Sequence, residues 1–437
     1  MKLALERGAS DAECTIAEGE EFSAHVRMRE LEQLKDAGSR RAGLRVLVGK
    51  CVGSAHTSDL SSAGIQQMVE SALALAAIST EDPFADLPDP SELGSLAGDF
   101  ELYSDDILNF DTAARIQAAI ETEEAALAWD PRITNSEGAS FSAHTGSRMF
   151  ANSRGFAGSY RTSSCSLSAT PVARQGDSME RDFWYSLARS HSKLASPASV
   201  GQRAAERTVR RLGARKVPTQ KAPVIFDPVT ARSLIGNIFE AVEGDAIYRK
   251  ASFLEGKIGE RVASENVTVI DDGTIPGLFG TSPFDDEGVP SRRTVVIDRG
   301  VLRSYLLNSY TARKLGLRTT GNAARGVTGN AGVGHGNFFL EKGQRPPEEI
   351  TRGIRRGLYV TELIGHGVNI VTGDYSRGAA GLWIENGEFA YPVSEITIAA
   401  TLQQMLMDVE AAGADLEFRG SVASPTLLIR EMTISGQ

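Results

Sequence analysis

The stretch LWIENGEFAYPV, residues 382–393, decides the fold class. Its Asn386-Gly387 pair stands between two runs in which apolar and polar residues alternate, the strongest short-range signal of a two-residue β-hairpin. A hairpin joins antiparallel strands. The rest of the second half is rich in glycine and resembles strands more than helices. The sequence therefore predicts an α+β fold with antiparallel sheets and packed helices.

Helical segments interrupt the strand-like runs of the second half. Asp227 and Pro228 form a typical helix start, with aspartate as the N-cap and proline at the first helical position. Steps of three and four residues then place one apolar stripe on this helix, made by Ala231, Leu234, Ile235, Ile238, Phe239 and Val242. A second long helix is predicted over TLQQMLMDVEAAG, residues 401–413.

The first half shows a different pattern and suggests a division into three regions. Four strand-like runs between residues 13 and 57 and an amphipathic helix at 60–78 predict an N-terminal α/β domain, a β-meander plus helix, over residues 1–90. After the Pro- and Asp-rich connection at 82–94, a central α+β region is expected over residues 91–216. It contains helices near 111–129 and from Ser196, and a meander with turns at Ser-Arg-Gly and Gln-Gly-Asp. A glycine-rich, β-dominated C-terminal domain is expected over residues 217–437.

Composition excludes several classes of function. The net charge of −10 argues against direct nucleic-acid binding, which needs a basic surface. No window approaches 18 uncharged apolar residues, so no membrane span is expected. The first residues turn acidic and lack an apolar core, unlike a signal peptide. Three widely spaced cysteines, Cys14, Cys51 and Cys165, suit a reducing compartment. We expect a cytoplasmic protein.

The helix that begins at Pro228 resembles the active-site helix of a zinc protease but lacks the imidazoles. Glu240 and Glu243 lie one turn apart beside its apolar stripe. Zinc in such a helix needs two histidines on one face and a carboxylate that activates the bound water. Of the six histidines, His191 is the nearest in sequence, and no cysteine follows Cys165. The sequence therefore predicts neither a metal site nor catalytic residues here.

Two other constellations offer weaker candidates. GVGHGN, residues 332–337, lacks the strand and helix that a dinucleotide-binding loop requires, so we interpret it as a flexible loop. His366, Asp374 and Ser376 are close in sequence, but no GxSxG elbow surrounds the serine. Asp374, Tyr375 and Arg377 could instead line a cavity or hold a peptide backbone, although a structural role in a strand end is the interpretation we favour.

Several longer stretches resemble the TldD/PmbA family, also called modulators of DNA gyrase, and its PmbA (TldE) branch in particular. The resemblance spans nearly the whole chain. It is carried by MFANSRGF at 149–156, EAVEGD at 240–245, GKIGERVAS at 256–264, DDEGVPSRRTVVIDRGVL at 285–302, YLLNSYTARKLGLRTTGNA at 305–323 and GDYSRGAAGLWIENGEFAYPVSEITIA at 373–399. The last two stretches are highly specific.

The resemblance also implies what the helix has lost. The TldD branch carries His-Glu-x-x-x-His on this helix, and a cysteine near the C-terminus completes its zinc site. Here Phe239 and Glu240 stand at the His-Glu position, the next histidine falls in a short deletion before Glu243, Gly244 and Asp245, and the cysteine is missing. Phe239, Glu240, Glu243 and Asp245 would then mark a vestigial active-site helix, with zinc expected only in a TldD-type partner.

The function implied by the resemblance is that of a subunit. A PmbA/TldE-type chain would pair with a TldD-type chain in a heteromeric metalloprotease that degrades unfolded peptides and trims leader peptides of ribosomally made antibiotics such as microcins. Two alternatives stay open. The chain could be a stand-alone homodimer that binds peptides without cleaving them, or a peptidase with a non-zinc site.

Overall fold

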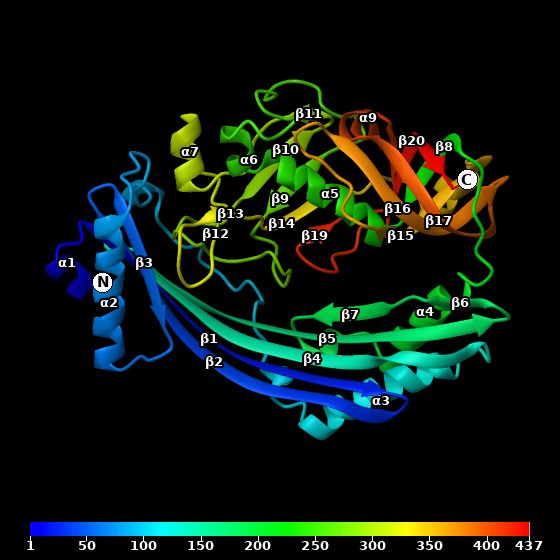
Figure 1. Ribbon diagram of the computed structural model, residues 1–437, viewed down its shortest axis with the longest axis horizontal. Helices are drawn as coiled ribbons and strands as arrows, with labels where there is room; N and C mark the ends of the chain where they lie inside the picture. The colour runs from blue at the N-terminus through cyan, green and yellow to red at the C-terminus, as the bar shows by residue number, and fades with distance from the viewer. Residues whose placement is uncertain (437) are drawn as a thin grey trace.

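A computed structural model describes residues 1–436 of the chain. It has an N-terminal unit, coloured blue to green in Figure 1, and a C-terminal unit, coloured green to red. The long strands of the first unit run along one side of the second unit. Helices and antiparallel sheets alternate along the chain as separate blocks, so the α+β prediction is confirmed.

The N-terminal unit is built on one antiparallel sheet. Among the described residues its strand order is β3-β2-β1-β4-β5-β6, with β7 paired to β5. The strands are β1 (Asp11–Arg27), β2 (Glu30–Val48), β3 (Cys51–Thr57), β4 (Ile133–Asn152), β5 (Ala157–Gln175), β6 (Ser178–Arg181) and β7 (Trp184–Ala188). The prediction of four short runs between residues 13 and 57 is wrong. Residues 30–48 form one strand, because pairing with β1 satisfies the backbone even where the side chains are exposed.

Helices cover one face of this sheet. Alternate side chains of β1, such as Ala12, Ala24 and Val26, are buried on that face. Ala12 packs in a cluster with α2, whereas Ala24 and Val26 pack in a cluster with α3 and α4. The helical segments are α1 (Lys2–Glu6), α2 (Ser62–Ile78), η1 (Pro90–Glu92), η2 (Asp105–Ile107), α3 (Thr112–Leu127), η3 (His191–Lys193) and α4 (Pro197–Val209). None of the helices within residues 1–436 is long and apolar enough to cross a membrane.

The C-terminal unit contains two larger sheets and a small one. Within the described residues their strand orders are β17-β16-β15-β8-β20-β18, β11-β10-β9-β14-β19 and β12-β13. The strands are β8 (Gln220–Phe226), β9 (Val269–Asp272), β10 (Arg293–Asp298), β11 (Val301–Leu302), β12 (Ala323–Ala324), β13 (Gly332–Val333), β14 (Asn337–Leu340), β15 (Arg356–Ile364), β16 (Asp374–Glu385), β17 (Glu388–Thr401), β18 (Val409–Ala412), β19 (Val422–Ala423) and β20 (Leu427–Ser435). Most pairs are antiparallel, whereas β8–β15 and β14–β19 are parallel.

The helix predicted from Asp227 lies in the core of this unit. Its residues form α5 (Pro228–Val242), and the Asp227 side chain accepts a hydrogen bond from the Thr230 amide, which confirms the predicted N-cap. Leu234 and Ile238 are 1% exposed and belong to the large apolar cluster of the unit. The remaining helices are α6 (Gly244–Tyr248), α7 (Ser309–Leu315), α8 (Pro347–Arg352) and α9 (Leu402–Met407).

The predicted hairpin is confirmed, and the predicted long helix after it is wrong. Asn386 and Gly387 join β16 to β17 with φ values of 52° and 82°, as a type I′ turn requires. Residues 401–413 form only the short α9 before the chain enters β18. Val409 and Ala411 pair there with β20, so burial in the sheet outweighs helix propensity.

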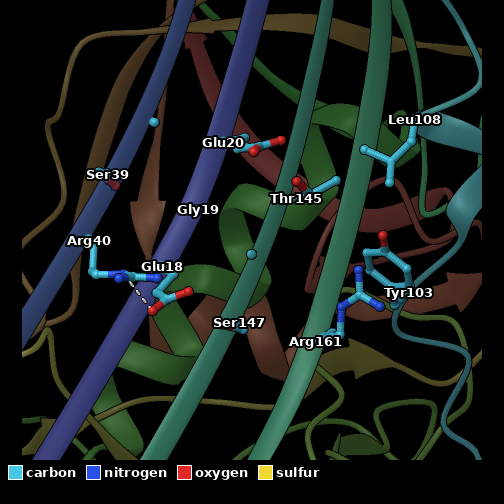
Figure 2. A pocket seen from close by; sticks show the side chains of 12 residues that line it. Glu18, Gly19, Glu20, Ser39, Arg40, Tyr103, Leu108, Thr145, Ser147 and Arg161 are labelled. Carbon is cyan, nitrogen blue, oxygen red and sulfur yellow. Dashed lines mark ion pairs between the residues drawn. The ribbon is translucent and has the colours of Figure 1, made fainter.

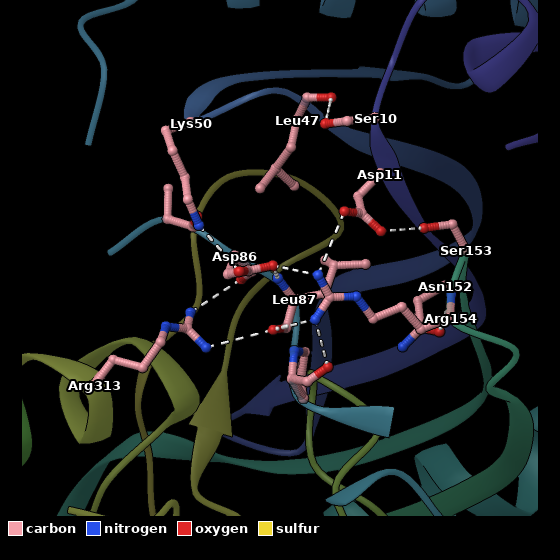
Figure 3. Close-up of polar contacts among 12 residues, drawn as sticks. Ser10, Asp11, Leu47, Lys50, Asp86, Leu87, Asn152, Ser153, Arg154 and Arg313 are labelled. Atoms are coloured by element: carbon pink, nitrogen blue, oxygen red, sulfur yellow. Dashed lines mark hydrogen bonds and ion pairs between the residues drawn. The ribbon is translucent and has the colours of Figure 1, made fainter. Parts of the chain in front are cut away.

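The segment between α2 and η1 joins the two units, as Figure 3 shows. Arg154, just after β4, donates to the carbonyl oxygens of Leu87 and Pro88 and pairs with Asp86. Arg313, on α7, donates to the carbonyl oxygens of Asp86 and Leu87 from the other side. Guanidinium groups of both units thus hold one extended segment. The division at residues 90 and 216 stays a prediction, and the strands of residues 11–57 and 133–188 share one sheet.

Candidate functional site

The end of α5 carries the residues that the sequence singles out. The helix stops at Val242 because Glu243 adopts an extended conformation, with ψ of 141°. The Gly244 amide then donates to the Leu306 carbonyl, and α6 begins. Glu240 is exposed, whereas Glu243 and Asp245 are partly buried around the break. The three carboxylates therefore lie around a helix break and are not on one face of a single helix.

Like charges meet at this break. Burial raises the pKa of Glu243 to about 7, and the nearby Asp245 and Glu240 carboxylates add to the effect. Burial also raises the pKa of Asp245, while Arg249 acts in the opposite direction. A carboxyl group with such a pKa holds its proton near neutral pH. The cluster is thus electrostatically strained when it is ionised.

We expect Glu243→Gln to remove part of the pH dependence of stability. The folded pKa of about 7 lies above the ordinary value of 4.5, so the folded state binds the proton more tightly than the unfolded state. The contribution of Glu243 to stability is therefore complete at low pH and is lost as the pH rises between these two values. The melting temperature of Glu243→Gln should exceed that of the wild type by about 2 °C near pH 8 and converge with it near pH 5. The exposed Glu240→Gln serves as the control, and an equal shift in both variants would contradict this account.

Aromatic contacts surround Phe239 on α5. The Phe239 ring meets the His335 ring edge to face, with centroids 4.7 Å apart, and also contacts Phe338. His335 Nδ1 lies 2.8 Å from the Gly336 carbonyl oxygen. Burial lowers the pKa of His335, which keeps this imidazole neutral. The histidine closest to this part of α5 is thus packed against a phenyl ring.

These residues do not fit a zinc ion. A tetrahedral zinc site needs three or four imidazole, thiolate or carboxylate ligands that converge. Phe239 offers no ligand atom, and Glu240 lies exposed on the other side of the helix break from Asp245. No group of three or more His, Cys, Asp or Glu side chains within residues 1–436 is placed to hold a metal.

The three residues considered for peptide binding, Asp374, Tyr375 and Arg377, have separate environments. Asp374 is exposed and accepts from the Thr372 hydroxyl at 2.6 Å. Tyr375 is 2% exposed within the core, and burial raises its pKa to about 12. Arg377 reaches α5, where its Nη1 donates to Ser233 Oγ at 2.7 Å. No hydrogen bond among the described residues links the His366, Asp374 and Ser376 side chains.

The sequence did not indicate a polar cavity of about 370 Å³ between β5 and the C-terminal unit. Its lining includes Tyr160 and Thr162 of β5, together with Arg189, Asp271 and His335. Burial raises the pKa of Asp271 to about 7. The lining comes from segments far apart in the sequence. Two stretches named in the sequence analysis contribute to it: DDEGVP supplies Asp285, and GVGHGN supplies Gly334, His335 and Gly336. Burial and the neighbouring Glu287 raise the pKa of Asp285.

A larger pocket of about 560 Å³ lies on the helix-bearing face of the first sheet (Figure 2). Most of its charged groups are already engaged. Glu18 pairs with Arg40 at 2.6 Å, and the Arg161 guanidinium lies 3.6 Å from the centre of the Tyr103 ring. The cavity near His335 is therefore the better candidate, because it adjoins α5 and contains buried ionisable groups.

Comparison with known proteins defines the class of this chain. Models of the PmbA/TldA metallopeptidase match residues 12–76 as domain 1, 105–212 as the central domain and 219–436 as the C-terminal domain. These matches cover most of the chain, so the chain has the domain composition of a metallopeptidase of this type. The chain belongs to the PmbA/TldD (PmbA/TldA) metallopeptidase family.

Relatives named PmbA support the PmbA branch, and solved structures share the fold. The chain is 37% identical to the "Metalloprotease PmbA homolog" of Haemophilus influenzae and 39% identical to "Metalloprotease PmbA" of Escherichia coli O157:H7, in both cases over 100% of this chain and 94% of the relative. A Bacteroides thetaiotaomicron structure described as a modulator of DNA gyrase aligns with a TM-score of 0.93 at 28% identity, over 100% of this chain and 97% of that one. TldE from Thermococcus kodakarensis has the same fold, with a TM-score of 0.89 at 21% identity, over 100% of this chain and 98% of that one.

Proposed function

We propose that this chain is the non-catalytic PmbA/TldE-type subunit of a heteromeric metalloprotease. A TldD-type chain with the His-Glu-x-x-x-His motif would hold the zinc, whose chemistry is the activation of water. The pair would degrade unfolded peptides and process leader peptides of peptide antibiotics. One observation carries the proposal. At the position of the motif, α5 presents Phe239, packed edge to face against His335, where the other branch has a histidine.

The contacts around α5 support a subunit with a substrate-binding role. The helix is held firmly, because Asp227 caps its start and its apolar stripe is buried. The cavity beside His335 is polar and lies between the two units. A chain of this kind would line part of the substrate-binding cavity and offer a surface to its partner, while the partner would hold the metal. The cytoplasmic location and the lack of direct nucleic-acid contact stay predictions.

Mixing this chain with a TldD-type relative from the same genome tests the proposal. We expect the two chains, at micromolar concentration, to elute together from a size-exclusion column in a fixed ratio. The complex should cleave an unfolded polypeptide such as reduced, alkylated casein. A TldD-type chain from which the metal has been removed serves as the control. Two chains that stay separate would contradict the proposal.

The two alternatives predict different results. A stand-alone peptide-binding homodimer would elute as a dimer and bind peptides even after the partner is added, without entering a mixed complex. A peptidase with a non-zinc site would cleave casein by itself in the presence of a chelator. The buried carboxylate of Asp271 in the cavity favours a capacity to bind peptides in the isolated chain as well.

A further inference from the structure

The polar cavity beside β5 contains buried atoms without partners. Asp271 is 2% exposed, and its Oδ2 accepts from the Asn322 side chain at 2.7 Å. Its Oδ1 has no partner of full hydrogen-bond geometry among the described residues, although the Gly336 amide is close enough to the carboxylate to lower its pKa. Arg189 Nε, a donor, is likewise buried without an acceptor among residues 1–436. One lone acceptor and one lone donor therefore belong to side chains that line the same cavity, and such orphaned groups are costly unless a ligand or water pairs with them.

The other acidic groups of the cavity already have partners. Asp286 pairs with Arg148 at 2.7 Å. Asp285 accepts from the backbone amides of Glu287, Val289 and Ala323. The Asp271 carboxylate is thus the acceptor that is left for a ligand. A buried carboxylate binds a cationic donor more strongly than a neutral one.

A row of hydroxyl groups leads away from the cavity along β5. Every second residue of this strand carries a hydroxyl on the face opposite the α3 and α4 helices. The hydroxyl row consists of Tyr160, Thr162, Ser164, Ser166, Ser168 and Thr170. Its side chains are half-buried and make no side-chain hydrogen bond with other residues that the structure describes. The first two, Tyr160 and Thr162, also line the cavity.

Contacts between the two units lie on both sides of this row. Near its start, the Tyr160 ring meets the Phe284 ring edge to face at 5.4 Å. Beside its far end, the Tyr185 hydroxyl of β7 donates to the Arg419 carbonyl oxygen and accepts from Arg232 of α5. The middle of the hydroxyl row therefore faces the C-terminal unit between two contact regions.

The spacing of the row matches an extended peptide. Same-face residues of a strand recur every 6.6–6.8 Å, about the repeat at which an extended peptide presents its N–H and C=O groups along one edge. A hydroxyl both donates and accepts, so it pairs with either group. Such contacts involve the main chain of the peptide and not its side chains. They are therefore independent of peptide sequence, as a binder of unfolded peptides requires.

We propose that the cavity binds the terminal ammonium group of an extended peptide through Asp271, while the hydroxyl row holds the main chain that follows. This inference names the substrate contacts of the proposed subunit and rests on that function. The amino end would lie next to Asp271, and the peptide would run along β5 from Thr162 towards Thr170. The peptide carbonyl nearest the cavity would accept a hydrogen bond from Arg189 Nε.

Calorimetric titration of the full chain tests this inference with two peptides of about ten residues, which when extended would reach along the hydroxyl row. Both consist of alternating alanine and serine, and one has an acetylated amino terminus. We expect acetylation to weaken binding about tenfold or more, because a charged hydrogen bond is lost. Asp271→Asn should bind both peptides equally. Equal affinity of the two peptides for the wild type, or no binding of either, would overturn the proposal.

The hydroxyl row is tested separately with Ser164→Ala, Ser166→Ala and Ser168→Ala combined. The triple variant should lose about tenfold or more in affinity for both peptides, since three hydrogen bonds disappear. Ser147→Ala with Ser159→Ala, on the opposite face of the same sheet, should bind like the wild type. Equal binding by the triple variant and this control would overturn the proposal.

An assembly experiment with the TldD-type chain distinguishes failure of this inference from failure of the proposed subunit function. If the triple variant no longer enters the complex yet binds peptide normally, the hydroxyl row is a subunit interface and the inference is wrong. If the wild type binds the peptides as expected but never enters a complex, the subunit proposal fails and the peptide site stands.

Discussion

Glu13→Gln lowers the free energy of unfolding by about 3–5 kcal/mol, the usual effect of removing one partner from a buried ion pair. Glu13 of β1 is 2% exposed and pairs with Arg45 of β2 at 2.8 Å and with Arg325 from the C-terminal unit. Burial alone would raise the pKa of Glu13, but attraction to Arg325 and Arg45 holds it below its ordinary value. Glutamine would remove the carboxylate that forms ion pairs with both buried guanidinium groups at the junction of the units, and Asp286 and Glu287 would attract Arg325 without pairing with it.

Urea unfolding followed by tryptophan fluorescence measures this loss. Glu18→Gln is the matched control, because Glu18 lies on the same strand and pairs with Arg40 at 2.6 Å on an exposed surface. An exposed pair contributes less than about 1 kcal/mol. Because the folded pKa of Glu13 is lowered, its contribution is present above the unfolded pKa and is lost as the pH falls through the folded value. Equal losses in both variants would show that the buried cluster does not join the units.

Local signals were enough to predict the parts of the fold that local chemistry determines. The Asn386-Gly387 turn needs positive φ at both residues, and few other pairs adopt it. Asp227 and Ser196 each cap a helix with their side chains and precede a proline at the first turn. In these places the favoured local conformation and the fold agree.

Partners distant in sequence determine the parts that were predicted wrongly. The exposed stretch of β2 carries no alternating apolar pattern, yet its backbone pairs with β1 along residues 30–47. Residues 409–412 become a strand because β20 lies beside them. Glu240 and Glu243 were predicted to lie one turn apart on one helix, but Glu243 is extended and the helix breaks there between α5 and α6.

The cavity could not be predicted for the same reason. Its orphaned atoms belong to Arg189 and Asp271, which lie in different units, and the hydroxyl row belongs to a strand whose serines read as ordinary surface positions. The alternation along β5 does predict which side chains share a face. It does not predict what lies across from that face, because this depends on how the two units pack.

In the proposed complex, Glu240→Gln of this chain leaves the rate of peptide cleavage within about twofold of the wild type. The same change in the His-Glu-x-x-x-His motif of the TldD-type partner should lower kcat by about a thousandfold or more, since a carboxylate that activates metal-bound water acts directly in the reaction. In the proposed complex the two glutamates would occupy equivalent helices, so the comparison would isolate the role of the surrounding ligands. Beside Glu240 the neighbouring residue is Phe239, whose ring packs against His335 and binds no metal.

Cleavage of alkylated casein by the four combinations of wild-type and variant chains measures this difference. Zinc content of each purified complex provides a second readout, with about one zinc per pair expected in every combination. A large loss of kcat from Glu240→Gln, with complex formation and zinc content unchanged, would mean that α5 takes part in the chemistry. The proposal requires instead that only the partner's glutamate matters, because a carboxylate without imidazole or thiolate neighbours has no bound water to activate.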